Sequence, residues 1–108
     1  MAELTKSEKK QFRELLKKGI LRRHAEWQNE MRELLDRQFD DEIGNEFDRT
    51  MLLTDSSRKF YKEAMQMEDY YRTSMLIIGL RNLLHDGYLK VDDIAEFSEE
   101  LKMSLKSY

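Results

Sequence analysis

The sequence predicts an all-α fold, an antiparallel bundle of three to four helices of which two are long and two are short. The chain has no proline and only four glycines in 108 residues, whereas β-rich domains need many such residues at their turns. Its abundant residues include Leu, Glu, Lys, Arg and Met, which favour helices. Apolar residues also recur at helical spacing. We therefore expect a single helical domain over residues 1–108.

The first long helix is predicted at about residues 5–37. Thr5 and Glu8 have the spacing of a capping box, in which each side chain accepts a backbone N–H of the other residue. Basic residues before Gly19 also resemble the end of a helix. No capping residue follows Gly19, which favours a continuous helix, with a break at Gly19 as the alternative. One broad face carries the apolar residues Phe12, Leu15, Leu16, Ile20, Trp27, Met31, Leu34 and Leu35.

A short helix is predicted at about residues 41–54, after a loop in which Asp40 or Asp41 caps it. The cluster Asp55-Ser56-Ser57 resembles the start of a further helix, which places the end of the short helix near Thr54. A helix that runs unbroken through this cluster is the competing interpretation. The predicted buried face has an apolar residue at every fourth position: Phe39, Ile43, Phe47 and Met51.

The second long helix is predicted at about residues 57–85, paired with the first along its length. Residues 75–84 are apolar on almost every side, which is typical of a helix surrounded by others. The centre of the core, including Ile78, is therefore predicted here. Gly79 is interpreted as a point where another element packs closely, and Gly87 as the left-handed residue that ends the helix.

The last short helix is predicted at about residues 93–106. Asp93 and Glu96 have the spacing of a second capping box. The apolar stripe of this helix consists of Ile94, Phe97, Leu101 and Leu105. Together with the helix at 41–54, it is predicted to cover the two long helices.

The residues that carry most enzyme and metal chemistry are scarce. The chain has no cysteine, which excludes disulfides and thiolate chemistry, and its two histidines, His24 and His85, form no metal-binding motif. A calcium-binding loop around Gly87 would place Leu84 at a ligand position. We expect no enzymatic activity, no cofactor and no bound metal. Without an apolar leader or an apolar run of about 20 residues, a cytoplasmic location and no membrane contact are expected.

Charge is distributed unevenly along the chain. Residues 1–25 carry eight Lys or Arg and three Glu, whereas the remainder is acidic. The basic side chains Lys6, Lys10, Arg13 and Lys17 fall within about 60° of one another around a helix. Such a basic patch can follow a phosphate backbone, so nucleic-acid binding is the alternative function. It can equally contact an acidic protein surface, such as residues 36–48 or 86–100.

The function predicted from the sequence is a non-enzymatic helical interaction or regulatory module that self-associates. The two short helices are too short to cover both long ones, so part of an apolar stripe is expected to stay exposed unless a protein partner covers it. A homodimer or a protein partner is therefore expected. The candidate interface residues are Phe12, Ile20, Trp27 and Met31.

Overall fold

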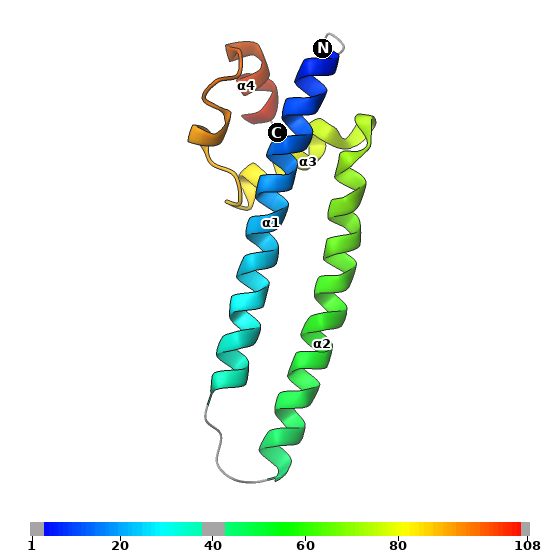
Figure 1. Ribbon diagram of the computed structural model, residues 1–108, viewed down its shortest axis with the longest axis vertical. Coiled ribbons are helices and arrows are strands. Elements are labelled where there is room, and N and C mark those ends of the chain that lie inside the picture. Colours follow the sequence, from blue (N-terminus) through cyan, green and yellow to red (C-terminus); the bar gives the residue numbers. More distant parts are fainter. Residues whose placement is uncertain (1–3, 38–42, 107–108) are drawn as a thin grey trace.

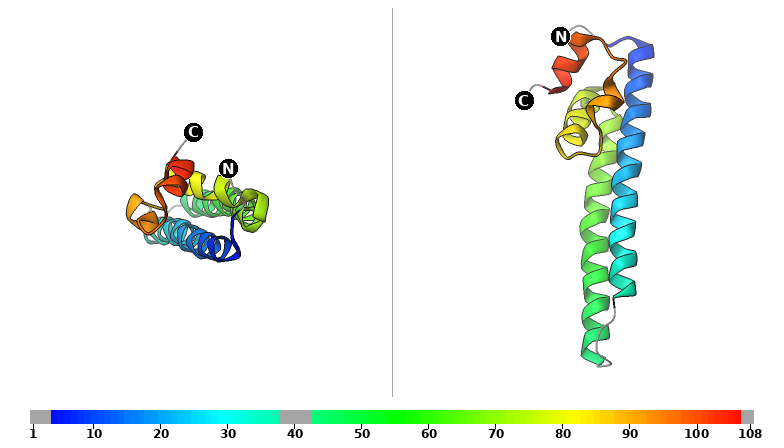
Figure 2. Two further views of the ribbon diagram at one scale, coloured as in Figure 1. Left: turned by 90° about the horizontal axis from the view of Figure 1, so that it is seen from above. Right: turned by 90° about the vertical axis from the view of Figure 1, so that its left-hand side faces the viewer.

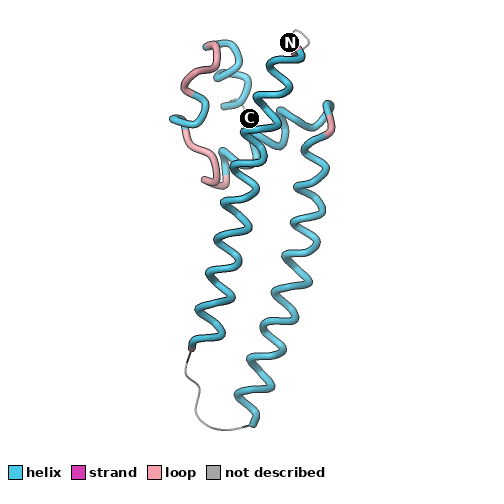
Figure 3. Tube along the Cα trace, in the orientation of Figure 1, coloured by secondary structure: helices cyan, strands magenta, loops and turns pink. Residues whose placement is uncertain are grey.

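The computed structural model describes residues 4–37 and 43–106. Within these ranges every regular element is a helix, which confirms the all-α prediction with two long and two short helices (Figures 1 and 3). The α-helices are α1 (Lys6–Asp36), α2 (Ile43–Glu68), α3 (Leu76–His85) and α4 (Glu99–Lys106). Three short 3₁₀ turns lie at Asp69–Tyr71, Thr73–Met75 and Val91–Ile94.

Helix α1 begins and continues as predicted. The N–H of Thr5 donates to Glu8 Oε1 over 2.9 Å and the N–H of Glu8 donates to Thr5 Oγ1 over 3.1 Å, which confirms the capping box. The helix passes Gly19 without a break. A Cβ atom at Gly19 would lie 2.9 Å from Leu83 Cδ1 and 3.0 Å from Leu89 Cγ. The absence of a side chain at Gly19 therefore lets Leu83 and Leu89 pack closely against α1.

The predicted end of a short helix near Thr54 is wrong, because α2 runs unbroken through residues 55–57 to Glu68. Ser56 caps nothing and instead accepts a hydrogen bond from Trp27 Nε1 over 3.0 Å. Ser56 therefore helps to hold α2 against α1 and does not start a helix. The predicted capping residues Asp40 and Asp41, and Phe39 with them, lie outside the described residues.

The predicted long helix at 57–85, paired with the first helix along its length, is also wrong. The chain leaves α2 after Glu68, Arg72 is extended at φ −67° and ψ 139°, and α3 follows. Arg13 contacts the carbonyl of Tyr71, so the end of α2 lies beside Arg13 of α1. Only about 10 Å of α1 lies between Arg13 and the N-terminus of that helix. A straight helix from residue 71 to 85 would continue for about 21 Å. The turn instead folds the apolar α3 back onto α1.

The core lies at the end of the molecule where α3 packs on α1 and α4 packs on α3 (Figure 2). Ile78, predicted at the centre of the core, is 46% exposed. Helix α3 packs against α1, α4 and the turns at residues 69–75, and Ile78 lies on the side of the helix that these neighbours leave exposed. The buried apolar residues are Phe12, Leu15, Leu16, Ile20, Phe60, Met67, Leu76, Leu80, Leu83, Leu89, Ile94 and Leu105.

Helix α4 begins later than predicted, at Glu99. The proposed capping box of Asp93 and Glu96 is wrong, since Ser98 Oγ accepts the N–H of Leu101 over 3.3 Å and caps the helix. The apolar stripe of the segment is confirmed, because Ile94 and Leu105 are fully buried. The end of α3 is confirmed as well, with Gly87 at φ +86°.

The molecule is elongated, with extents of 60 × 24 × 23 Å and a radius of gyration of 18.1 Å. A compact domain of about 100 residues has a radius of gyration of about 13 Å. The C-terminal half of α1 and the N-terminal half of α2 form a two-helix stalk, which α3 and α4 do not reach (Figures 1 and 2). The accessible surface is 7995 Å², against about 6,400 Å² for a compact monomer of this mass.

Candidate interaction surface

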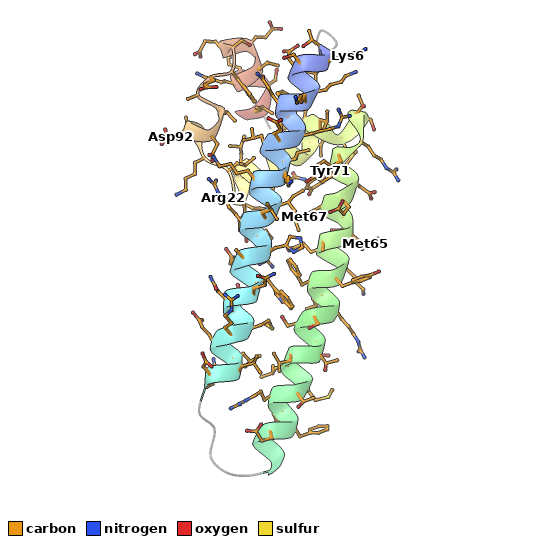
Figure 4. The ribbon with its side chains drawn as sticks, viewed as in Figure 1. Lys6, Arg22, Met65, Met67, Tyr71 and Asp92 are labelled. Atoms are coloured by element: carbon orange, nitrogen blue, oxygen red, sulfur yellow. The ribbon has the colours of Figure 1, made fainter. Side chains whose placement is uncertain are left out.

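Helix α2 carries apolar residues on two opposite sides. The side that faces α1 includes Phe60 and Met67, which are 7% and 5% exposed. Met65, two residues before Met67, points away from α1 in Figure 4 and is 53% exposed. A helix that packs against one neighbour needs a single apolar stripe. The apolar side chains on the outer side, which are 43–67% exposed, are Phe47, Met51, Tyr61 and Met65.

The apolar residues on the outer side belong to a regular row, which we call the outward stripe. Its positions alternate in steps of four and three residues and, at 100° per residue, lie within about 80° around the helix. This is the spacing of a coiled-coil seam. A shallow groove lies along its centre, lined by residues that include Thr54, Arg58 and Tyr61. The outward stripe consists of Phe47, Met51, Thr54, Arg58, Tyr61 and Met65.

Charged residues flank the outward stripe in two blocks of opposite sign. Asp48 and Asp55 accompany its N-terminal half, and Lys59 and Lys62 accompany its C-terminal half. All four side chains are exposed. They lie on the same flank, at about 60–120° from the centre of the stripe. The surface is therefore an apolar row with an acidic and a basic end.

Contacts between α1 and α2 fix which side of α2 faces outward. The rings of Trp27 and Phe60 stack with centroids 4.8 Å apart and planes 4° from parallel. Arg23 pairs with Glu63 over 2.5 Å and lies 5.0 Å from the centroid of Phe60. Near the C-terminus of α1, at the end of the stalk far from α3, Arg49 donates to the carbonyl of Leu35 over 3.2 Å. These contacts lie on the side of α2 opposite to the outward stripe.

The four candidate interface residues predicted from the sequence contribute to the packing of the chain itself. Phe12 is fully buried and Ile20 is 4% exposed. Trp27 and Met31 are half-buried, and Trp27 stacks on Phe60. Sequence reasoning missed the outward stripe because it assigned Phe47 and Met51 to a buried face. The four-three spacing that continues across residues 55–57 was the signal that could have found it.

The predicted basic patch is only partly exposed. Lys6, Lys10 and Lys17 are exposed along the N-terminal half of α1. Arg13 is half-buried and donates to the Tyr71 carbonyl over 3.3 Å and to Thr73 Oγ1 over 3.2 Å. Arg13 therefore holds the connection between α2 and α3, and three lysines remain at the surface.

A polar cluster joins residues 88–93 to α1. The carboxylate of Asp93 lies 2.8 Å from Arg22 and 2.9 Å from Lys18, and it accepts the N–H of Lys90 over 2.8 Å. Hydrogen bonds from Arg22 and Lys18, followed by that from Lys90, hold the pKa of Asp93 well below its usual range. One carboxylate therefore ties two cationic side chains of α1 to the segment that follows α3, which is a structural role.

Tyr88 makes a second tie between this segment and α1. Its hydroxyl donates to Glu26 Oε1 over 2.7 Å. Burial, followed by this hydrogen bond, raises the pKa of Tyr88 to about 12. Because the hydroxyl stays protonated at neutral pH, it keeps donating to the carboxylate, which is a structural role.

No protein-family model, curated protein or solved structure matches this chain significantly. In residues 4–37 and 43–106, no helix combines the length and the apolar character that crossing a membrane requires. The same part of the chain has no group of three or more His, Asp or Glu placed to hold a metal ion.

Proposed function

We propose that this chain is a non-enzymatic helical interaction module and that the outward stripe of α2 is its contact surface. The observation that supports this most is that four large apolar side chains stay exposed in one row, although the core of the chain is formed without them. Single exposed apolar residues are ordinary on protein surfaces. A row of about 27 Å from Phe47 to Met65, apolar at both ends with Thr54 and Arg58 between them, is the kind of surface that a partner covers.

The composition of the outward stripe favours a protein partner. Aromatic residues, Met and Arg are enriched in the cores of protein interfaces, and the stripe combines Phe47, Tyr61 and Arg58 with two methionines. Helices commonly recognise one another through such rows of apolar side chains. The stripe also lies on a long helix held by its stacking and ion-pair contacts with α1, so little order has to be gained on binding.

An affinity capture from extracts of the source cell, with the full chain as bait, tests this function. We expect proteins that the wild type retains after nuclease treatment to be lost with Tyr61→Glu, because a carboxylate within the stripe is left desolvated and unpaired. Leu21→Glu is the matched control, since Leu21 is a 55% exposed apolar residue on α1 outside the stripe. Retention that is equal for the wild type and Tyr61→Glu would contradict the proposed surface.

The second candidate function is nucleic-acid binding through α1. It is favoured by the exposure of Lys6, Lys10 and Lys17 along one helix, which suits contact with successive phosphates. The engagement of Arg13 with Tyr71 and Thr73 weakens it. The nuclease arm of the same capture separates the two functions. Partners held through nucleic acid are lost on nuclease treatment, whereas partners held by the outward stripe remain.

A further inference from the structure

We infer that the outward stripe binds the same stripe of a second copy of this chain, with the two α2 helices antiparallel about a two-fold axis that passes near Ser56. This inference rests on the proposed function and names its partner. It requires the stripe to complement itself in shape and in charge, since a two-fold interface places one surface against its equivalent. The residues of α2 meet both requirements.

The spacing of the outward stripe reads the same in both directions. From Phe47 to Met65 the steps are four, three, four, three and four residues. When two such helices run antiparallel with residue 56 at the centre, Phe47 of one copy lies opposite Met65 of the other. By the same symmetry Met51 lies opposite Tyr61, so each aromatic ring packs against a methionine, a favourable contact.

The charges also favour the antiparallel arrangement. In a parallel, in-register pair the acidic end would meet the acidic end. The antiparallel pair brings Lys62 of one copy near Asp48 of the other, and Lys59 near Asp55, along one flank. Each of these pairings occurs twice by symmetry. The opposite flank brings Glu46 near Glu68, and Asp55 lies near its own copy beside the two-fold axis. Both contacts oppose association, so the charges set the orientation more than they add to the affinity.

The exposed area is sufficient for such a dimer. The accessible surface of 7995 Å² exceeds that of a compact monomer of this mass by about 1,600 Å². A standard protein interface buries about 800 Å² on each partner. This excess belongs to the whole elongated molecule, and a second copy that covers α2 on the side away from α1 would bury part of it without disturbing the core.

Sedimentation equilibrium of the full chain at micromolar concentrations tests the identity of the partner. We expect the wild type to approach twice the monomer mass of 13.1 kDa. Tyr61→Glu is expected to weaken the dimer by about 100-fold or more, as for a large aromatic residue buried in an interface, and the change occurs twice by symmetry. Leu21→Glu is expected to leave it unchanged. A wild type that remains at 13.1 kDa, or a dimer that Tyr61→Glu does not weaken, overturns the inference.

The same measurement on charge variants tests the orientation. Lys62→Asp places two carboxylates together at each end of the antiparallel pair and is expected to weaken the dimer about 10-fold. Adding Asp48→Lys to that variant restores attraction and is expected to recover the affinity. Within one helix the two positions are about 21 Å apart, so recovery cannot arise inside a chain. A double variant weaker than Lys62→Asp overturns the antiparallel arrangement. If the wild type is monomeric but still captures proteins that Tyr61→Glu loses, the partner is not a second copy of this chain. The inference is then overturned, whereas the proposed function stands.

Discussion

Leu80→Ala is expected to lower the free energy of unfolding by about 2–5 kcal/mol. Leu80 is fully buried in the core that α3 forms with its neighbours. Truncation removes the transfer energy of the deleted methyl groups and leaves a cavity, because the helices around it are held by many other contacts. Urea unfolding followed by far-ultraviolet circular dichroism measures the change, and the cost is large beside the roughly 5–15 kcal/mol of a typical domain.

Ile78→Ala is the matched control for Leu80→Ala, since it removes the same number of carbon atoms from a neighbouring position of α3. Ile78 is 46% exposed, so its loss is expected to cost less than about 1 kcal/mol. The two variants together test which face of α3 is buried. Equal losses, or a larger loss for Ile78→Ala, would contradict the described packing of α3.

Gly79→Ala is expected to destabilise the chain by about 1–3 kcal/mol through overpacking. The expected sign is notable because alanine is favoured over glycine within helices by about 1 kcal/mol. A Cβ atom at Gly79 would lie 2.5 Å from Cγ and 2.6 Å from Cβ of Tyr70. These atoms lie close to the backbone, and the Tyr70 hydroxyl accepts a hydrogen bond from Asn82 over 3.1 Å, so the ring is held at both ends.

A double-mutant cycle separates crowding from any other effect of Gly79→Ala. In a Tyr70→Gly background the crowding atoms are absent, and Gly79→Ala is expected to be neutral or stabilising. Chemical denaturation of the four proteins gives the coupling free energy between the two positions. An equal cost of Gly79→Ala in both backgrounds would show that contact with Tyr70 is not the cause.

The parts of the fold that depend on neighbouring residues were predictable from the sequence. The capping box of Thr5 and Glu8, the passage of α1 through Gly19 and the left-handed Gly87 are local features, and all three are confirmed. The close approach of another residue at Gly79 was also predicted, whereas that at Gly19 was not distinguished from a kink. Each depends on the chemistry of one or two turns of helix.

The helix boundaries that were predicted wrongly depend on tertiary contacts. Residues 55–57 have the composition of a helix start, but Ser56 is used to accept a hydrogen bond from Trp27, 29 residues earlier in the chain. The turn around Arg72 has no proline or glycine to predict it. The need for this turn comes from the length of α1, because a straight continuation of α2 would carry the apolar residues of α3 past the N-terminus of α1.

The face of α2 that turns outward could not be predicted for the same reason. The residues Phe47 and Met51 form an apolar row, which usually indicates burial. The side of α2 that faces α1 is fixed by the stacking of Trp27 on Phe60 and by the ion pair of Arg23 with Glu63. Only these contacts show that the row faces away from α1. The candidate surface therefore appears only when the hairpin is assembled.

A mixing experiment with two charge variants tests most directly that the outward stripe of α2 binds the outward stripe of a second copy. Lys62→Asp and Asp48→Lys each place like charges together when paired with themselves, so each variant alone is expected to sediment mainly at 13.1 kDa near the wild-type dissociation constant. In an equimolar mixture, the aspartate introduced into one chain meets the lysine introduced into the other, and the unchanged Lys62 and Asp48 meet at the opposite end of the pair. We expect the mixture to sediment as a dimer, and a mixture that stays as monomeric as its two components would contradict the pairing of α2 with α2 of a second copy.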